Sequence, residues 1–271
     1  MLIKLIAILA VLVGIAGLVL PVIPGVFLII IGLLLFFKDR TADVRKFLPE
    51  KIPAVAAVLY NWFIPKLLLP HYKSIASEIA LSGGKTILDI GTGPGVLPIE
   101  IARTFSNCKI TGIDLSGKMI EIASKNKASR RWQGSRVQEN VEFKIMDAKR
   151  LEFPSNTFDM VISTGSLHHW KEPVKVIDEI HRCLKPGSEA WIYDGYADAK
   201  DEDIDKSVRK ILKIFPPNGF IRHMMHIHGY NKTGYETQIS ETIHQTRFKE
   251  CVFEPRGIMM RIKLKKLTAD S

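Results

Sequence analysis

Hydrophobic residues are distributed unevenly along the chain. Between Leu5 and Phe37 no residue carries a charge, and nearly every position is Leu, Ile, Val, Ala, Gly or Phe. A straight helix over this segment would be about 50 Å long, whereas the hydrocarbon core of a bilayer is about 30 Å thick. The pattern is typical of a membrane anchor, and its length indicates that the anchor bends.

The bend is predicted at residues 21–25, Pro-Val-Ile-Pro-Gly, because proline removes a helical donor and glycine permits a turn. The arms on either side have about 16 and about 12 residues, which is short for complete crossings. A pair of transmembrane spans and a re-entrant hairpin therefore both fit, and a single kinked crossing is the alternative.

Basic residues flank both ends of the apolar segment: Lys4 precedes it, and Lys38, Arg40, Arg45 and Lys46 follow it. Because basic flanks favour the cytoplasm, we expect a hairpin with both ends, and the rest of the chain, on the cytoplasmic side. A cleaved secretory signal is disfavoured, since the run is too long for an h-region and no small-residue cleavage site precedes the basic flank.

We expect residues 1–40 to form the membrane anchor and residues 41–71 to form interfacial or linker helices. Prolines at positions 49, 53, 65 and 70 divide this second region into short apolar stretches. Its aromatic residues suit a membrane interface. A cover for a substrate pocket and a helix that packs on the core of the next domain are the alternatives.

From Lys85 the pattern changes to short β-rich runs separated by segments of helical periodicity. Residues 86–90, Thr-Ile-Leu-Asp-Ile, predict a buried strand, and the glycine-rich residues 91–95 lead directly into a helix. Residues 109–113 predict a second strand that ends on Asp114, where an acidic side chain can accept the hydroxyls of a ribose. The spacing of the glycines is G-x-G-x-G, which disfavours a dinucleotide.

These motifs resemble those of the class I S-adenosylmethionine-dependent methyltransferases. Residues 87–95, ILDIGTGPG, are similar to the first motif of that family, and residues 112–116, GIDLS, resemble the second. The resemblance covers about residues 72–268. The stretch SLHHW at 166–170 and the turn LKPG at 184–187 resemble a broad small-molecule group that includes quinone and lipid-intermediate enzymes. Three further segments follow in the family's order: residues 146–148, 158–163 and 190–193.

The resemblance implies an α/β, Rossmann-like domain over residues 72–271 with a seven-stranded sheet. Runs at 251–254 and 258–264 resemble the antiparallel C-terminal hairpin that closes this sheet. A charged helix is expected over about residues 201–215, and another over residues 235–246. The complete expectation is therefore a methyltransferase domain preceded by a transmembrane or re-entrant helical hairpin.

The resemblance also implies a site for S-adenosylmethionine. The backbone around Gly91, Gly93 and Gly95 would hold the methionine portion, Asp114 the ribose, and Asp147 with Ala148 the adenine. Asp89 would shape the turn beneath the methionine portion, although Asp89 and Asp114 could instead cap the helices that follow their strands. The remaining expected contacts are Thr92, Leu115, Met119, Ser163 and Thr164.

His168 and His169 are the candidate catalytic residues, because histidine titrates near neutral pH and can take a proton from a substrate hydroxyl or carbon acid. A structural or substrate-packing role is the alternative. No metal is expected: His223, His226 and His228 have no Cys or Asp at ligand spacing beside them, and we interpret that stretch as a lid or an interfacial loop. The three cysteines are interpreted as reduced thiols.

The net charge of +10 fits either nucleic acid or anionic lipid headgroups, and a solvated basic surface is the alternative. Enzymes that methylate exocyclic amines of bases usually carry [DNS]-P-P-[YF] after the fourth strand, whereas residues 163–166 read Ser-Thr-Gly-Ser. We therefore predict a membrane-bound methyltransferase whose partners are membrane lipids and a small, lipophilic acceptor. An RNA, DNA or protein methyltransferase and a non-catalytic membrane scaffold that binds the cofactor are the alternatives.

Overall fold

The structure is a computed structural model that describes residues 54–83, 85–129, 135–195, 232–257 and 259–268. The predicted anchor, the charged helix at 201–215 and the histidines at 223, 226 and 228 lie outside these residues. No helix within the described ranges is both long enough and apolar enough to cross a membrane. All of the described residues belong to one compact unit.

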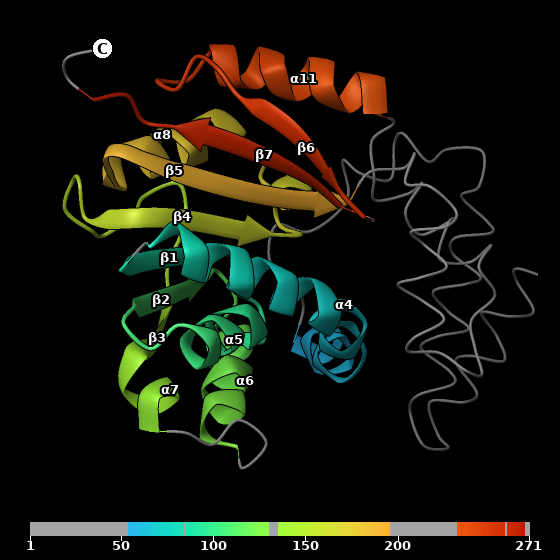
Figure 1. Ribbon diagram of the computed structural model, residues 1–271. Helices are drawn as coiled ribbons and strands as arrows, with labels where there is room; N and C mark the ends of the chain where they lie inside the picture. Colours follow the sequence, from blue (N-terminus) through green and yellow to red (C-terminus); the bar gives the residue numbers. More distant parts are fainter. Residues whose placement is uncertain (1–53, 84, 130–134, 196–231, 258, 269–271) are drawn as a thin grey trace, which may run out of the picture. The chain divides into compact units, whose positions relative to one another are not determined.

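A seven-stranded mixed sheet forms the centre of this unit, with the strand order β3-β2-β1-β4-β5-β7-β6 (Figure 1). The first five strands are parallel, β7 runs antiparallel to β5, and β6 runs antiparallel to β7. The predicted sheet with its antiparallel C-terminal hairpin is confirmed. The strands are β1 Thr86–Ile90, β2 Lys109–Asp114, β3 Val141–Ile145, β4 Phe158–Thr164, β5 Leu184–Gly195, β6 Val252–Arg256 and β7 Met259–Lys265.

Helices cover both faces of the sheet, as the alternation of apolar side chains along the strands requires. In β5, Trp191 and Tyr193 pack in one buried cluster, with residues of α4 and α5, while Ala190 and Ile192 pack in another, with residues of α8 and α11. The helices are α4 Ala54–Ser82, α5 Val96–Thr104, α6 Gly117–Ala128, α7 Ser135–Asn140, α8 Pro173–Cys183 and α11 Lys232–His244, with a 3-10 turn, η4, at Leu167–His169.

Helix α4 differs from the prediction for its part of the sequence. The prolines at 65 and 70 were expected to divide the region into short stretches, but the structure has one helix from Ala54 to Ser82. The helix changes direction between its blue and teal parts in Figure 1, as expected where proline removes a backbone donor. Its second half is held by burial of Tyr72, Ile75, Ala76 and Ile79, so packing outweighs the cost of the prolines.

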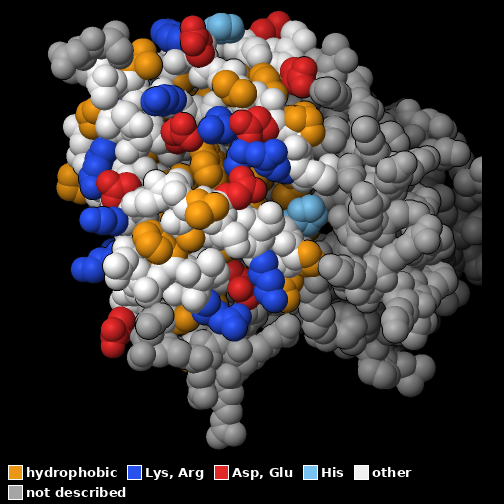
Figure 2. Space-filling view, viewed as in Figure 1, with side chains coloured by type: hydrophobic (Ala, Val, Ile, Leu, Met, Phe, Trp, Pro, Cys, Tyr) orange, Lys and Arg blue, Asp and Glu red, His pale blue; other side chains and the backbone are white. Residues whose placement is uncertain are grey.

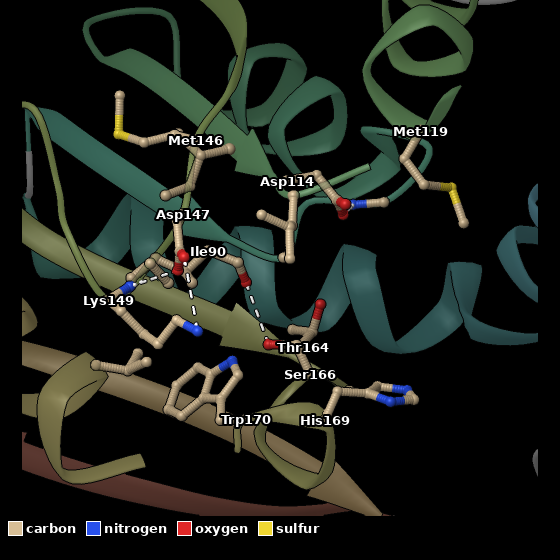
Figure 3. A pocket seen from close by; sticks show the side chains of 17 residues that line it. Ile90, Asp114, Met119, Met146, Asp147, Lys149, Thr164, Ser166, His169 and Trp170 are labelled. Atoms are coloured by element: carbon tan, nitrogen blue, oxygen red, sulfur yellow. Dashed lines mark hydrogen bonds and ion pairs between the residues drawn. The ribbon is translucent and has the colours of Figure 1, made fainter. Parts of the chain in front are cut away.

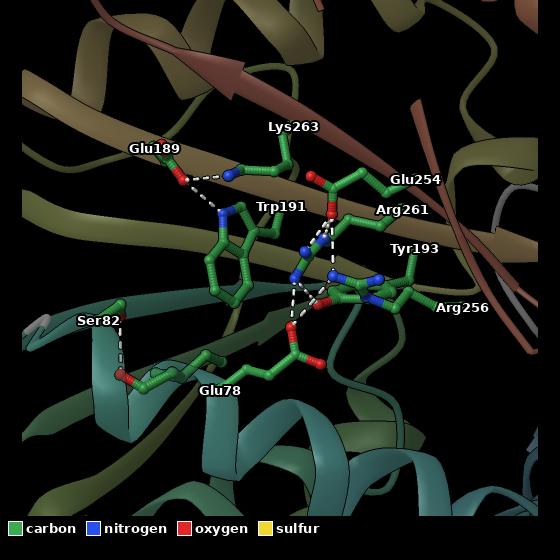
Figure 4. Close-up of polar contacts among 10 residues, drawn as sticks. Glu78, Ser82, Glu189, Trp191, Tyr193, Glu254, Arg256, Arg261 and Lys263 are labelled. Carbon is green, nitrogen blue, oxygen red and sulfur yellow. Dashed lines mark hydrogen bonds and ion pairs between the residues drawn. The ribbon is translucent and has the colours of Figure 1, made fainter. Parts of the chain in front are cut away.

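A buried arginine fixes α4 to the C-terminal hairpin (Figure 4). The Arg261 guanidinium donates to Glu78 of α4 at 2.5 Å through Nη1 and to Glu254 of β6 at 2.8 Å through Nε, and it lies 4.6 Å from the centre of the Trp191 ring. Nη1 also donates to the Tyr193 hydroxyl at 3.3 Å. One side chain therefore joins α4 to β5 and β6.

Candidate active site

A pocket lies at the carboxyl ends of the parallel strands, where ligands bind in open α/β sheets (Figure 3). The strand ends of β1, β2, β3 and β4 supply most of its wall, and α6, η4 and α8 supply the remainder. Its lining residues are Ile90, Gly91, Gly93, Ile113, Asp114, Leu115, Met119, Met146, Asp147, Ala148, Lys149, Thr164, Gly165, Ser166, His169, Trp170 and Val176.

Most of the predicted site residues line this pocket. They are Gly91, Gly93, Asp114, Leu115, Met119, Asp147, Ala148, Thr164 and His169. The other predicted residues, Asp89, Thr92, Gly95, Ser163 and His168, do not line it. Four of these five are adjacent in sequence to a residue that lines the pocket, and Gly95 lies two residues from Gly93. The motifs therefore locate the site, while the fold decides which side chains reach it.

The glycine-rich turn between β1 and α5 has a backbone conformation that other residues rarely adopt. Gly91, Gly93 and Gly95 have φ values of 69°, 52° and 73°. A Cβ atom at Gly91 would lie 2.6 Å from the Ser166 Cβ, and one at Gly95 would lie 2.8 Å from the Ala123 Cβ. Both the conformation and the close packing therefore require glycine at these two positions.

Asp114, the last residue of β2, is held in a fixed orientation at the pocket wall. Its Oδ2 accepts the Gly93 N–H at 3.0 Å and its Oδ1 accepts the Ser116 N–H at 2.8 Å. The bond to Ser116 is a local turn between residues two apart; Ser116 itself is the N-cap of α6, so Asp114 does not fill the capping role that was its alternative. Each carboxylate oxygen has two lone pairs, so the same group can accept further hydrogen bonds from a ligand in the pocket.

Asp89 lies in β1 beneath the turn and is 1% exposed. Neither carboxylate oxygen has a hydrogen-bond partner of good geometry in the part of the chain that the structure describes. Burial raises the pKa of Asp89 to about 7; the Thr92 hydroxyl lowers it and the negative charge of Asp114 adds to the rise. A cation or a hydrogen-bond donor placed beside such a buried acid would stabilise its ionised form.

Asp147 and Lys149 form a charged pair on the opposite wall of the pocket (Figure 3). The Lys149 backbone N–H donates to Asp147 Oδ1 at 2.9 Å, and its ammonium lies 3.7 Å from Asp147 Oδ2 and 3.5 Å from Glu172 Oε1. The Trp170 indole lies below this pair in Figure 3. Sequence reasoning missed Lys149 and Trp170 as site residues, although they lie within or next to motifs that it used.

Two serine hydroxyls join β4 to the glycine-rich turn. The buried Ser163 hydroxyl donates to the Ile90 carbonyl at 2.9 Å and lies 2.5 Å from the Ser166 hydroxyl. Ser163 was predicted to contact the cofactor, but its side chain is fully buried under the pocket. Ser166, which was not predicted, lines the pocket instead because of the turn that follows β4.

His168 is paired with Asp194, the penultimate residue of β5, which is 2% exposed. The carboxylate accepts the His168 backbone N–H at 2.9 Å and lies 2.8 Å from His168 Nδ1. It also accepts the Gly195 N–H at 2.8 Å. Because an ionised carboxylate only accepts hydrogen bonds, this arrangement places a proton on Nδ1. The ring of His169 lies 4.1 Å from that of His168, centre to centre, and lines the pocket.

No group of three or more His, Cys, Asp or Glu side chains among the described residues is arranged to hold a metal ion. The acidic and histidine side chains of the site lie instead along a pocket at the ends of parallel strands. The fold is therefore a seven-stranded α/β domain with an open pocket at the carboxyl ends of its parallel strands.

Comparisons with known proteins identify the family of this domain. Residues 81–250 match the sequence profile of a methyltransferase domain family, and the chain belongs to this family. The predicted class, a methyltransferase that uses S-adenosylmethionine, is confirmed at the level of the family.

Two curated relatives show the range of proteins that this chain is similar to. A phosphoethanolamine N-methyltransferase of Caenorhabditis elegans is 30% identical over 178 residues, which are 64% of this chain and 37% of the relative. A sterol 24-C-methyltransferase of Saccharomyces cerevisiae is 27% identical over 177 residues, which are 64% of this chain and 45% of the relative. The chain therefore spans about two fifths of the length of these relatives.

Solved structures confirm the fold. A candidate S-adenosyl-L-methionine-dependent methyltransferase from Methanococcus maripaludis has a TM-score of 0.64 at 23% sequence identity, over 79% of this chain and 94% of that one. The domain is thus a Rossmann-like methyltransferase fold.

The residues present fit S-adenosylmethionine. The glycine turn gives a ligand close access to the backbone, and Asp114 and Asp147 both line the pocket with carboxylates suited to hydroxyl and amine donors. The buried carboxyl group of Asp89, whose oxygens have no hydrogen-bond partner among the described residues, lies beneath the turn, where the cofactor's methionine portion is expected.

Proposed function

We propose that this chain is an S-adenosylmethionine-dependent methyltransferase that acts at the cytoplasmic face of a membrane on a small, lipophilic acceptor. The observation that supports the activity best is the pocket in which the glycine turn, Asp114 and Asp147 lie together at the ends of adjacent parallel strands. The apolar segment Leu5–Phe37 supports the location.

S-adenosylmethionine, when bound, supplies a methyl group that is already activated for transfer by its sulfonium. The protein's contribution is then mainly alignment and exclusion of water. Asp114 would hold the ribose hydroxyls, and its bond to the Gly93 N–H keeps the turn and the ribose-binding carboxylate in a fixed relation. Asp147 would accept the adenine amino group, with the Trp170 ring on that side of the pocket.

His168 is the stronger candidate for a general base, because Asp194 fixes its Nδ1 as a donor and leaves proton uptake to Nε2. This is the arrangement in which a buried carboxylate orients an imidazole for catalysis. It suits an acceptor that loses a proton during methylation, such as a hydroxyl or an acidic carbon. His169, which lines the pocket, would pack against the acceptor.

A lipophilic acceptor is supported by the predicted anchor, because tethering to a membrane raises the local concentration of enzyme and lipid substrate. The two relatives are named for phosphoethanolamine and for a sterol, which are chemically unlike one another. Quinones, isoprenoids and lipid head groups are therefore all within the proposed class.

Nucleic acid is a weaker candidate. Basic and acidic side chains are interspersed on the face shown in Figure 2, over α4 and the C-terminal hairpin, and they do not form a basic stripe there. Basic residues of the C-terminal hairpin pair with acids, as Lys263 does with Glu189 at 3.3 Å. A strand of nucleic acid requires a continuous positive surface.

The first test is calorimetric titration of the full-length protein with S-adenosylmethionine and S-adenosylhomocysteine. We expect micromolar binding, and loss of about tenfold or more in Asp114→Ala, because the hydrogen bonds of one charged group are removed. Methyl transfer from labelled S-adenosylmethionine into a total lipid extract then tests the acceptor class. A folded protein that binds neither compound contradicts the enzyme; binding without transfer to any extract favours a non-catalytic scaffold.

A further inference from the structure

The glycine-rich turn is supported from outside by α6. Gly95 packs against Ala123, which lies one helical turn before Asn126 on the same side of α6. The Asn126 side chain reaches the turn itself: its Nδ2 donates to the Pro94 carbonyl at 2.9 Å. Asn126, which does not line the pocket, thus holds the backbone of the turn through the Pro94 carbonyl.

The same amide nitrogen also contacts α4. Asn126 Nδ2 donates its second hydrogen to Asn61 Oδ1 at 3.0 Å. An amide nitrogen has two hydrogens, so these two acceptors use both of them. The Asn61 oxygen therefore fixes the rotation of the amide that holds Pro94, and the turn, α6 and α4 are joined at one nitrogen atom.

Asn61 lies outside the part of the chain that matches the family, since that match begins at residue 81. It belongs to the first half of α4, the helix whose other end is held to the C-terminal hairpin through Glu78 and Arg261. In sequence, α4 begins within residues 41–71, the region predicted to form interfacial or linker helices between the predicted anchor and the catalytic domain. Through Asn61, this region contacts α6 beside the glycine turn.

We propose that Asn126 and Asn61 are positioning residues for cofactor binding: Asn126 holds the Pro94 carbonyl and thereby the glycine turn, and Asn61 of α4 holds Asn126. The inference rests on the proposed function only in that the turn binds S-adenosylmethionine. Asn61 itself makes no contact with the pocket and acts through Asn126.

Two aspartate substitutions of nearly equal size separate the roles of donor and acceptor. Asn126→Asp removes both donated hydrogens, whereas Asn61→Asp keeps an acceptor for the Asn126 amide. The measurement is the affinity of the full-length protein for S-adenosylhomocysteine by calorimetry, together with the Tm of each variant without ligand. We expect binding about tenfold weaker in Asn126→Asp, about threefold weaker in Asn61→Ala, and within about twofold of the wild type in Asn61→Asp, the range expected for one or two hydrogen bonds.

Binding of S-adenosylhomocysteine to the wild type separates a failure of the proposed function from a failure of the positioning role. If the wild type does not bind S-adenosylhomocysteine, the proposed function is wrong. If it binds and Asn61→Ala binds equally well, or if Asn61→Asp weakens binding as much as Asn61→Ala, the positioning role is overturned. A role confined to stability would lower the Tm of these variants without changing their affinity. Should Asn126→Asp fail to fold, the two Asn61 variants still decide, because they change only the second contact.

Discussion

At the scale of single residues, the hydrogen bonds of the Asp194 carboxylate within the described part of the chain all come from N–H groups. They are the backbone N–H groups of His168 and Gly195 and the Nδ1–H group of His168. Backbone N–H groups cannot become acceptors, but an imidazole can, by moving its proton to the other nitrogen. The residue at position 194 therefore determines which nitrogen of His168 is protonated.

Asp194→Asn should reverse this tautomer. An asparagine must direct its amide hydrogens at one of the three N–H groups, and only His168 can respond, by accepting at Nδ1 and carrying its proton on Nε2. We expect methyl transfer into lipid extract to fall by about 10²- to 10⁴-fold, the usual contribution of a general base, with unchanged affinity for S-adenosylhomocysteine. Nitrogen NMR of labelled histidine reports the tautomer directly.

The control for Asp194→Asn is Glu189→Gln, which changes another carboxylate of the same strand. In a His168→Ala background Asp194→Asn should cause no further loss of turnover, because the residue acts through His168. An unchanged tautomer together with unchanged turnover would mean that His168 is not the base.

Asp89 gives a prediction for the dependence of stability on pH. Its pKa is about 7 in the folded protein, against an ordinary value of 3.8. Between these values the folded state keeps a proton that the unfolded chain has lost, so stability falls as pH rises from about 4 to about 7 and this contribution is then constant. At 1.36 kcal/mol per pKa unit the full effect is roughly 4 kcal/mol.

Asp89→Asn cannot titrate, so its free energy of unfolding should improve relative to the wild type as pH rises through this window. Denaturant unfolding at pH 4.5, 6 and 7.5 measures the difference. The exposed carboxyl of Glu152 supplies the control, since Glu152→Gln should follow the wild type at all three values. Parallel curves for Asp89→Asn and the wild type would mean that Asp89 is ionised in the folded protein throughout.

The sequence motifs predicted the location of the site better than the individual contacts. Thr164 and Ser163 are adjacent in β4, and strand alternation decides that Thr164 lines the pocket while Ser163 is buried below it. Asp194 could not be recognised, because its role depends on β5 lying beside β4 and its loop, at a separation of 26 residues from His168. A short sequence motif contains no information on that contact.

At the scale of elements, the buried Arg261 suggests how α4 is stabilised. The guanidinium is 5% exposed and contacts Glu78 on α4 and Glu254 on β6. Arg261→Ala would leave two partly buried carboxylates without their shared cation and expose them to mutual repulsion. We expect a loss of about 2 to 3 kcal/mol in the free energy of unfolding, reduced from fully buried cases because both glutamates retain some contact with water.

Chemical denaturation followed by tryptophan fluorescence measures this loss, and Lys263→Ala is the matched control. Lys263 lies on the same strand and pairs with Glu189, but its side chain is 28% exposed, so its removal should cost less than about 1 kcal/mol. Arg261→Lys should resemble Arg261→Ala more than the wild type, since lysine lacks the planar group that contacts both glutamates. Equal losses in the Arg261 and Lys263 variants would contradict a special role for the buried arginine.

The elements could be predicted partly from periodicity and partly from the family resemblance. Alternation predicted β1 and β2, and the expected helix at 235–246 overlaps α11 Lys232–His244. The resemblance supplied β4, β5 and the C-terminal hairpin, whereas β3 was not predicted as a separate strand. The prolines of α4 were misleading, because each costs a helical hydrogen bond locally, while the burial of Ile75, Ala76 and Ile79 against the sheet is not visible in a local pattern. The LKPG residues also lie within β5, where a shift of register accommodates them.

At the scale of the whole molecule, the predicted anchor concerns residues outside those that the structure describes, and it stays a prediction from the sequence. If the uncharged segment Leu5–Phe37 inserts in a bilayer, the intact protein should remain in the membrane pellet after an alkaline carbonate wash, which removes peripheral proteins. A peripheral protein held only by its positive charge would be released by the wash and also by high salt, since surface electrostatics are screened.

The direction of insertion can be tested in the same membranes. A hairpin with basic flanks at Lys4 and at Lys38–Lys46 places both ends on the cytoplasmic side, so tags at the N-terminus and the C-terminus should both be cleaved by protease in inverted vesicles and both be protected in closed right-side-out vesicles. A single kinked crossing would give opposite results for the two tags. Only the hairpin leaves the catalytic domain and both basic flanks in the compartment where anionic lipids attract basic side chains. Cleavage of one tag and protection of the other would therefore contradict the charge argument for the hairpin. The assignment of the methyltransferase domain would be unaffected.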